Sequence, residues 1–100
     1  MASLVRLVRL TPGFLAQRGA CGAVSGTPAG RALAATLVAL GGAEDLPAPG
    51  DAATLLKPNE RGVSALVHVR RVPGHNLWLW YRIDRVGDVV LMTLEREPPT

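Results

Sequence analysis

Apolar and polar positions alternate most clearly in the second half of the chain. The segments 63–72 (VSALVHVRRV) and 77–83 (LWLWYRI) place branched or aromatic side chains at every second position, a pattern typical of β-strands. Residues 89–94 (VVLMTL) are apolar almost throughout, which indicates a central strand buried on both faces. Turn residues at 73–74 and 84–88 separate the three segments. The pattern therefore predicts an antiparallel meander of three strands.

The strand predicted over 77–83 distributes its side chains between two faces, because strand side chains alternate. One face carries Leu77, Leu79, Tyr81 and Ile83. The other face carries Trp78, Trp80 and Arg82. The same stretch holds both tryptophans and the one tyrosine of a chain whose only other aromatic residue is Phe14. It is therefore the first place to look for a functional surface.

The first half of the chain predicts a short N-terminal element and two helices. Residues 4–10 (LVRLVRL) suit either an amphipathic helix or a strand, and in the assembled fold we take them as a strand that joins the sheet. Thr11-Pro12 and Thr27-Pro28 each supply an N-cap followed by a proline at the first helical position. They predict a helix over 12–18 and a leucine-rich second helix that ends where Gly41 takes the C′ position.

The segment 41–62 differs in composition from the rest of the chain. It contains three prolines, four glycines and four of the eight acidic residues. This composition predicts a long surface connection, with at most one helical turn at 51–56 (DAATLL). A connection of this length in a small domain is usually functional or paired with something else.

Together these elements predict an α+β fold in which residues 1–100 form a single domain. The N-terminal strand and the two helices would pack on one face of an antiparallel sheet of three to four strands. The other face, or part of it, would then be left to the two tryptophans and Arg82.

Composition agrees with a folded, basic, cytoplasmic protein. Hydrophobic residues make up 48% of the chain, and the formal net charge is +3 with a pI near 10. A basic surface suits nucleic acid or an acidic protein as a partner. Cys21 is the only cysteine, so no intramolecular disulfide can form and a reducing compartment is the simplest expectation. No apolar run reaches the ~18 residues that span a bilayer, so we expect no membrane partner.

The N-terminus has an alternative interpretation. No acidic residue precedes Glu44, while four arginines do, and starts of this kind resemble organellar transit peptides. The same residues also form a strand pattern closed by the Thr11-Pro12 helix start, and their removal would take a real share of a small core. We expect a structural role and leave the targeting alternative open.

Short motifs for metal or covalent chemistry are missing from the sequence. His68, His75 and Cys21 have no ligand spacing, and no nucleophile elbow or phosphate-binding loop is present. We expect no metal and no cofactor.

The remaining candidate is a set of basic residues interleaved with aromatic ones. Its members are Arg70, Arg71, His75, Arg82, Arg85 and Arg96, with Trp78, Trp80 and Tyr81. Single-stranded nucleic acid is bound by stacking on aromatic rings and by cations that follow the phosphates. The residues alone favour a different role for the tryptophans, in the core of the small sheet. A third role is a hot spot for a protein partner.

Three stretches resemble the RelE/ParE superfamily of type II toxins. They are VRLTPGFLAQR at the start, the leucine-rich second helix, and NLWLWYRIDRVGDVVLMTLERE near the end. The resemblance implies a small α+β toxin with two N-terminal helices against an antiparallel sheet. It also implies an antitoxin partner whose tail wraps the toxin. Members that cut mRNA on the ribosome do so with basic and aromatic side chains rather than a metal.

Carried onto this sequence, the resemblance implies a catalytic set of Arg82, Arg96 and Tyr81. Tyr81 matches the tyrosine of the penultimate strand, and Arg96 is the one residue that stands in for the cationic tail of RNA-cutting members. RNA or phosphate contacts would come from Arg70, Arg71, His75 and Arg85. Trp78, which replaces an arginine of those members, and Trp80 would bind the partner.

We therefore expect the toxin-like component of a type II toxin-antitoxin module, with metal-independent mRNA cleavage as the enzyme mechanism. The alternative is a non-catalytic protein-binding module, either a gyrase-targeting or an inactive relative of the superfamily. Glu95 and Glu97 flank Arg96, and such acids are unfavourable beside a phosphate, which favours the alternative.

Overall fold

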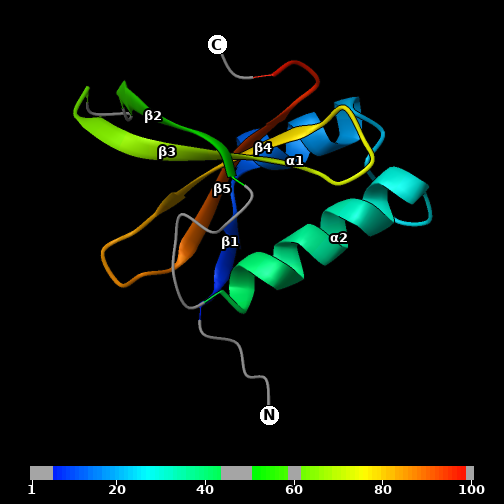
Figure 1. Cartoon of the computed structure of the whole chain (residues 1–100), viewed down its shortest axis with the longest axis horizontal. Helices are drawn as coiled ribbons and strands as arrows, with labels where there is room; N and C mark the ends of the chain where they lie inside the picture. The colour runs from blue at the N-terminus through cyan, green and yellow to red at the C-terminus, as the bar shows by residue number, and fades with distance from the viewer. Residues whose placement is uncertain (1–5, 44–50, 59–61, 99–100) are drawn as a thin grey trace.

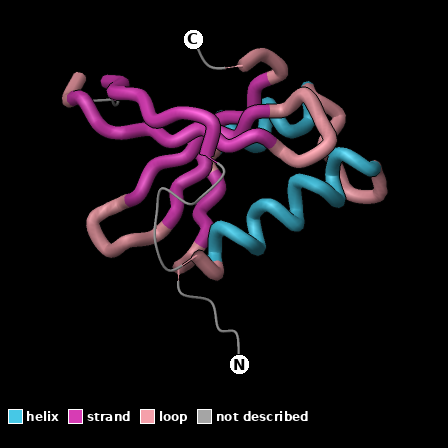
Figure 2. The backbone as a smooth tube through the Cα atoms, in the orientation of Figure 1, coloured by secondary structure: helices cyan, strands magenta, loops and turns pink. Residues whose placement is uncertain are grey.

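The computed structural model describes residues 6–43, 51–58 and 62–98 (Figure 1). The fold is α+β, with two helices and one five-stranded mixed sheet. In chain order the elements are β1 (Val8–Leu10), α1 (Pro12–Ala20), α2 (Pro28–Gly41), β2 (Asp51–Pro58), β3 (Ser64–Arg71), β4 (Trp78–Ile83) and β5 (Val89–Glu95). Figure 2 shows the strands gathered into one sheet with both helices toward one side of the view.

The order of strands in the sheet is β1-β5-β4-β3-β2. The predicted meander is confirmed, since β3, β4 and β5 pair antiparallel in sequence. An N-terminal strand joins the sheet as predicted, but residues 6 and 7 of the predicted segment 4–10 are not part of it, and it runs parallel to β5, with Val8 opposite Val89. The expected antiparallel sheet of three to four strands is therefore a mixed sheet of five.

The fifth strand corrects the prediction for the segment 41–62. Residues 51–58 are neither a surface connection nor a helical turn, because they form β2, antiparallel to β3. A hydrogen bond of 3.0 Å joins Thr54 Oγ1 to His68 Nδ1 across the two strands. The local sequence suits several conformations, and pairing with β3 selects the strand, as tertiary context commonly does. The predicted connections over 44–50 and 59–61 lie outside the described residues.

Both helix starts predicted from Thr-Pro pairs are confirmed. The Phe14 N–H donates to Thr11 Oγ1 at 3.2 Å, and the Gly30 N–H donates to Thr27 Oγ1 at 2.9 Å. The Thr11 hydroxyl also donates to the Leu91 carbonyl at 2.7 Å, which ties the start of α1 to β5. The predicted C′ position of Gly41 is wrong, because Gly41 is the last helical residue and Gly42 caps the helix with φ −94°. No left-handed residue is needed at that end.

The core lies between the helices and one face of the sheet. Phe14 of α1 and Leu33 and Leu40 of α2 pack in one cluster with the strand residues Leu79, Tyr81, Leu91 and Leu94. The predicted alternation along β4 is confirmed, since Leu79 and Tyr81 are fully buried while Trp78, Trp80 and Arg82 are half-buried. In β5 the residues Val89, Val90 and Leu91 are buried, as expected of an interior strand.

Two N-terminal arginines hold β1 against the turn between β4 and β5. Arg9 lies 3.2 Å from Asp88 and 3.6 Å from Asp84, and the Leu7 N–H donates to Asp88 Oδ1. Arg6 donates to the carbonyls of Ala43 and Gly87. These cations of the acid-poor N-terminus therefore have structural partners. Within the described ranges, no helix has the length and apolar character needed to cross a bilayer.

Candidate functional site

The sheet face turned away from the helices carries the candidate site. We call it the outer face and define it by Arg71, Trp78, Trp80 and Arg82. Arg71 and Trp78 are cross-strand partners in β3 and β4, and cross-strand partners share a face. Arg70 pairs with the buried Leu79, so it lies on the helix side of the sheet. The two adjacent arginines predicted to act together therefore lie on opposite faces.

The outer face has three rows, each formed by residues that are cross-strand partners in the sheet. The first row contains Trp78. The Arg71 guanidinium carbon lies 5.6 Å from the centroid of the Trp78 ring, within cation–π range. Two hydrogen bonds fix the guanidinium there: Nε donates to the His75 carbonyl and Nη2 donates to Asn76 Oδ1, both at 3.0 Å. Because both acceptors are neutral, the positive charge of Arg71 is oriented without being neutralised by them.

The second row is built around Trp80. The Lys57 ammonium of β2 lies 6.0 Å from the centroid of the Trp80 ring, and Trp80 pairs across the sheet with Val69 and Thr93. Val69 is fully buried, which agrees with an indole ring that lies over this part of the sheet. The Trp80 Nε1 atom is buried and has no hydrogen-bond partner among the described residues. Trp80 therefore combines a packing role with a partly open surface.

The third row pairs the half-buried Arg82 with Val90 of β5. The outer face also includes one acid, Glu95, which is the cross-strand partner of Trp78. Its carboxylate accepts a hydrogen bond of 3.0 Å from the Thr93 hydroxyl. Three cations and one carboxylate thus accompany the two tryptophans, and the local charge is positive.

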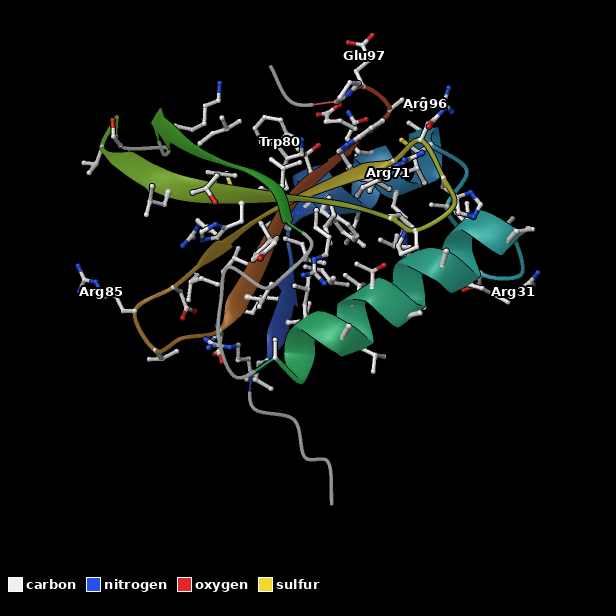
Figure 3. All side chains as sticks on the ribbon, in the orientation of Figure 1. Arg31, Arg71, Trp80, Arg85, Arg96 and Glu97 are labelled. Carbon is white, nitrogen blue, oxygen red and sulfur yellow. The ribbon has the colours of Figure 1, made fainter. Side chains whose placement is uncertain are left out.

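The other predicted site residues lie apart from the outer face. Arg85 is exposed in the turn after β4 and lies far from Arg71 and Arg96 in Figure 3. Arg96 is exposed and donates to the Ala20 carbonyl at the end of α1 at 2.7 Å. His75 is half-buried in the turn between β3 and β4 and supplies the carbonyl that holds Arg71.

Tyr81 lies in the core rather than on a surface. It has no exposed area, and its ring centroid is 5.2 Å from that of His68, itself 5% exposed. A side chain in this position supports the packing of the sheet. Of the predicted catalytic residues, Arg82 is therefore the one that the structure places on the outer face with both tryptophans.

Lys57 belongs to the outer face and was missed from the sequence. The composition of the surrounding segment predicts a surface connection, which assigns no place to this cation. Its signal in the sequence is weak, because two adjacent leucines at 55 and 56 obscure the alternation of β2. Among the described residues, no group of three His, Cys, Asp or Glu side chains could hold a metal ion.

Comparison of the chain with protein-family models, with curated proteins and with solved structures gives no match. The class defined by the observed geometry is a small α+β domain with one sheet face covered by helices and a basic, tryptophan-bearing outer face.

Proposed function

We propose that the chain is the toxin-like component of a two-protein toxin-antitoxin module and that its outer face binds single-stranded RNA. The observation that carries the proposal is the alternation of Lys57, Arg71 and Arg82 with Trp78 and Trp80 on a face that the helices do not cover. Aromatic rings that stack on bases and cations that contact phosphates are the usual means of binding single strands.

The order of elements also supports the proposal. A short strand and two helices precede the antiparallel strands, which is the arrangement that the resemblance to RelE/ParE toxins implies. The RelE/ParE-like sandwich is therefore the finer fold assignment that we propose.

Cleavage of the bound RNA would depend on Arg82. Tyr81 is buried and Arg96 is engaged at the end of α1, so neither lies beside the tryptophans. A guanidinium on the outer face can orient a phosphate and offset the charge that develops in the transition state. This mechanism needs no metal ion. Arg71, which lies on β3 opposite Trp78 at the other end of β4, would contact another phosphate of the same strand of RNA.

The test is the affinity of the purified chain for a fluorescein-labelled single-stranded RNA, measured by anisotropy at several salt concentrations. We expect Arg82→Gln to lower the affinity about fivefold and to reduce the salt slope by about one. Arg31→Gln is the matched control, because Arg31 is exposed on α2 and the charge change is the same. Equal losses in both variants would mean that only the net charge matters and would contradict the proposal.

A second candidate function is a non-catalytic protein-binding module. It is favoured by Glu95 beside Trp78 and by the apolar packing of Trp80, since interface hot spots combine tryptophan and arginine with a surrounding rim. Growth of a bacterial host after induction of the chain separates the two functions. Arrest with shortened mRNA supports the RNA-cutting toxin, whereas arrest with intact mRNA supports a protein target. Trp78→Ser would then abolish arrest in either case, while Arg82→Gln would abolish it only in the first.

A further inference from the structure

A groove on the helix side of the sheet lies between α2 and the end of β3. Its volume is about 380 Å³. It is lined by Ala32, Ala35, Thr36, Ala39, Arg70, Arg71 and Pro73. In Figure 1, α2 runs beside the connection from β3 to β4. Neither the outer face nor the proposed RNA contacts include it, apart from Arg71 at its rim.

The groove exists because the flank of α2 that faces β3 carries short side chains. The three leucines of α2 face the core, where Leu33 and Leu40 are buried and Leu37 packs against them. The flank repeats small residues at positions 32, 35, 36 and 39, the spacing of one helix face. The Thr36 hydroxyl donates to the Ala32 carbonyl at 2.9 Å, so it is satisfied within the helix. The wall formed by α2 is therefore apolar.

The opposite wall is cationic. Arg70 is half-buried, and its side chain lies on the helix side of the sheet because it pairs with the buried Leu79. Arg70 already has an interaction within the chain. Because a guanidinium carries five N–H donors, an anion in the groove can be bound in addition to that interaction. Arg71 also lines the groove, but its guanidinium is held over Trp78 on the outer face, so Arg70 supplies the cation of this wall.

We propose that this groove binds a small anionic amphiphile of the medium-chain carboxylate class. The alkyl chain would lie on the alanine wall, and the carboxylate would accept hydrogen bonds from Arg70. Pockets of about 300–1,000 Å³ with apolar walls and a few polar groups are typical of small-molecule sites. A carboxylate suits a guanidinium because the two groups form paired, charge-assisted hydrogen bonds.

The experiment is calorimetric titration of the full chain with decanoate below its micelle concentration. Decanol, which has the same chain without the charge, and acetate, which has the charge without the chain, are the comparison probes. We expect saturable binding of decanoate, with at least tenfold weaker binding of decanol and acetate. Absence of saturable decanoate binding, or equal binding of decanol, would overturn the proposal.

Substitutions on α2 locate the site. Ala35→Leu would fill the groove without entering the core, because Ala35 is exposed, and we expect it to weaken decanoate binding at least tenfold. Ala34→Leu is the matched control, since Ala34 is exposed on the same helix and does not line the groove. Thermal unfolding of both variants checks that each is folded. Equal decanoate affinity in the two variants would overturn the proposed location.

Substitutions of Arg70 test the anion contact. Arg70→Gln is expected to reduce decanoate binding to the level of decanol, while Arg70→Lys keeps part of the affinity because the charge remains. Unchanged decanoate binding in Arg70→Gln would overturn the assignment of Arg70. RNA affinity is also measured on Ala35→Leu. It should be unchanged, because the groove and the outer face are separate sites.

Discussion

The two ends of β4 use arginine in different ways. At the end that follows Ile83, Arg9 is paired with Asp84 and Asp88, and the carboxylates are only 21% and 14% exposed. At the beginning of the strand, Arg71 lies over Trp78, and its acceptors among the described residues are neutral. In the first arrangement the charge of Arg9 is paired with two carboxylates and joins β1 to the turn between β4 and β5. The second holds the guanidinium in place beside an indole ring, and in our proposal this charge contacts the RNA.

The two arginines therefore differ in the groups that they contact. Arg9 is paired with carboxylates, whereas Arg71, to which we assign RNA binding, donates to neutral acceptors. The sequence has ten arginines and one lysine, and nothing in their spacing distinguishes the two kinds. An arginine beside partly buried carboxylates has its charge paired within the fold, although an exposed pair contributes little to stability. An arginine oriented by neutral groups beside an aromatic ring is prepared to bind an anion.

The largest expected effect is on stability at the acid-paired end. Asp84→Ala removes the acceptor for the Val86 and Asp88 N–H groups as well as the partner of Arg9. We expect the free energy of unfolding to fall by about 2 kcal/mol, mostly from the lost turn hydrogen bonds. The exposed Arg9 contributes little of this, because its side chain is 56% exposed and screened by water. Urea denaturation measures the change, and a loss below about 0.5 kcal/mol would contradict the structural role of this end.

A smaller effect is expected at the tryptophan-stacked end, and there it concerns binding. Arg71→Gln should leave the free energy of unfolding within about 0.5 kcal/mol, since Arg71 is an exposed residue with neutral partners. RNA affinity should fall about fivefold, roughly 1 kcal/mol. Denaturation and anisotropy on the same preparation measure both quantities. An Arg71→Gln variant that is much less stable but binds RNA normally would mean that Arg71 has a structural role and no role in binding, which contradicts the account.

The smallest effect is expected from the acid of the outer face. Glu95→Gln removes the one carboxylate in the row of Arg71 and Trp78, so repulsion of a nearby phosphate should decrease. We expect RNA affinity to rise about twofold at low salt and the gain to disappear at high salt. Glu97→Gln is the control, because Glu97 is exposed in the tail beyond β5. A gain of equal size in both variants would point to net charge alone.

The sequence predicted the parts of the fold whose signals are local. Two Thr-Pro pairs located the helix starts, and the alternation in LWLWYRI assigned Leu79 and Tyr81 to the core. The strand β2 could not be predicted in the same way, because its sequence suits several conformations and pairing with β3 decides between them. The parallel direction of β1 depends in the same manner on its pairing with β5.

The candidate site was predicted by residue type but not by arrangement. The sequence identified Arg71, Trp78, Trp80 and Arg82, which share the outer face. Alternation places Arg70 and Arg71 on opposite faces of the strand, but the sequence could not decide which of them lies on the outer face, because that requires knowing which face of β3 meets the helices. Lys57 reaches the outer face because residues 51–58 form β2. Since that strand was not predicted, its cation was not predicted either.

The most direct test of the central claim is a map of the RNA contact on the protein. Two-dimensional NMR of the ¹⁵N-labelled chain, titrated with a short single-stranded RNA, reports the indole signals and the backbone of each strand separately. We predict that the largest shifts occur at Trp78, Trp80, Arg71 and Arg82, with α2 unaffected. Shifts confined to α2 or to the turn at Arg85, or no shifts at saturating RNA, would contradict the assignment of the outer face as the RNA-binding surface.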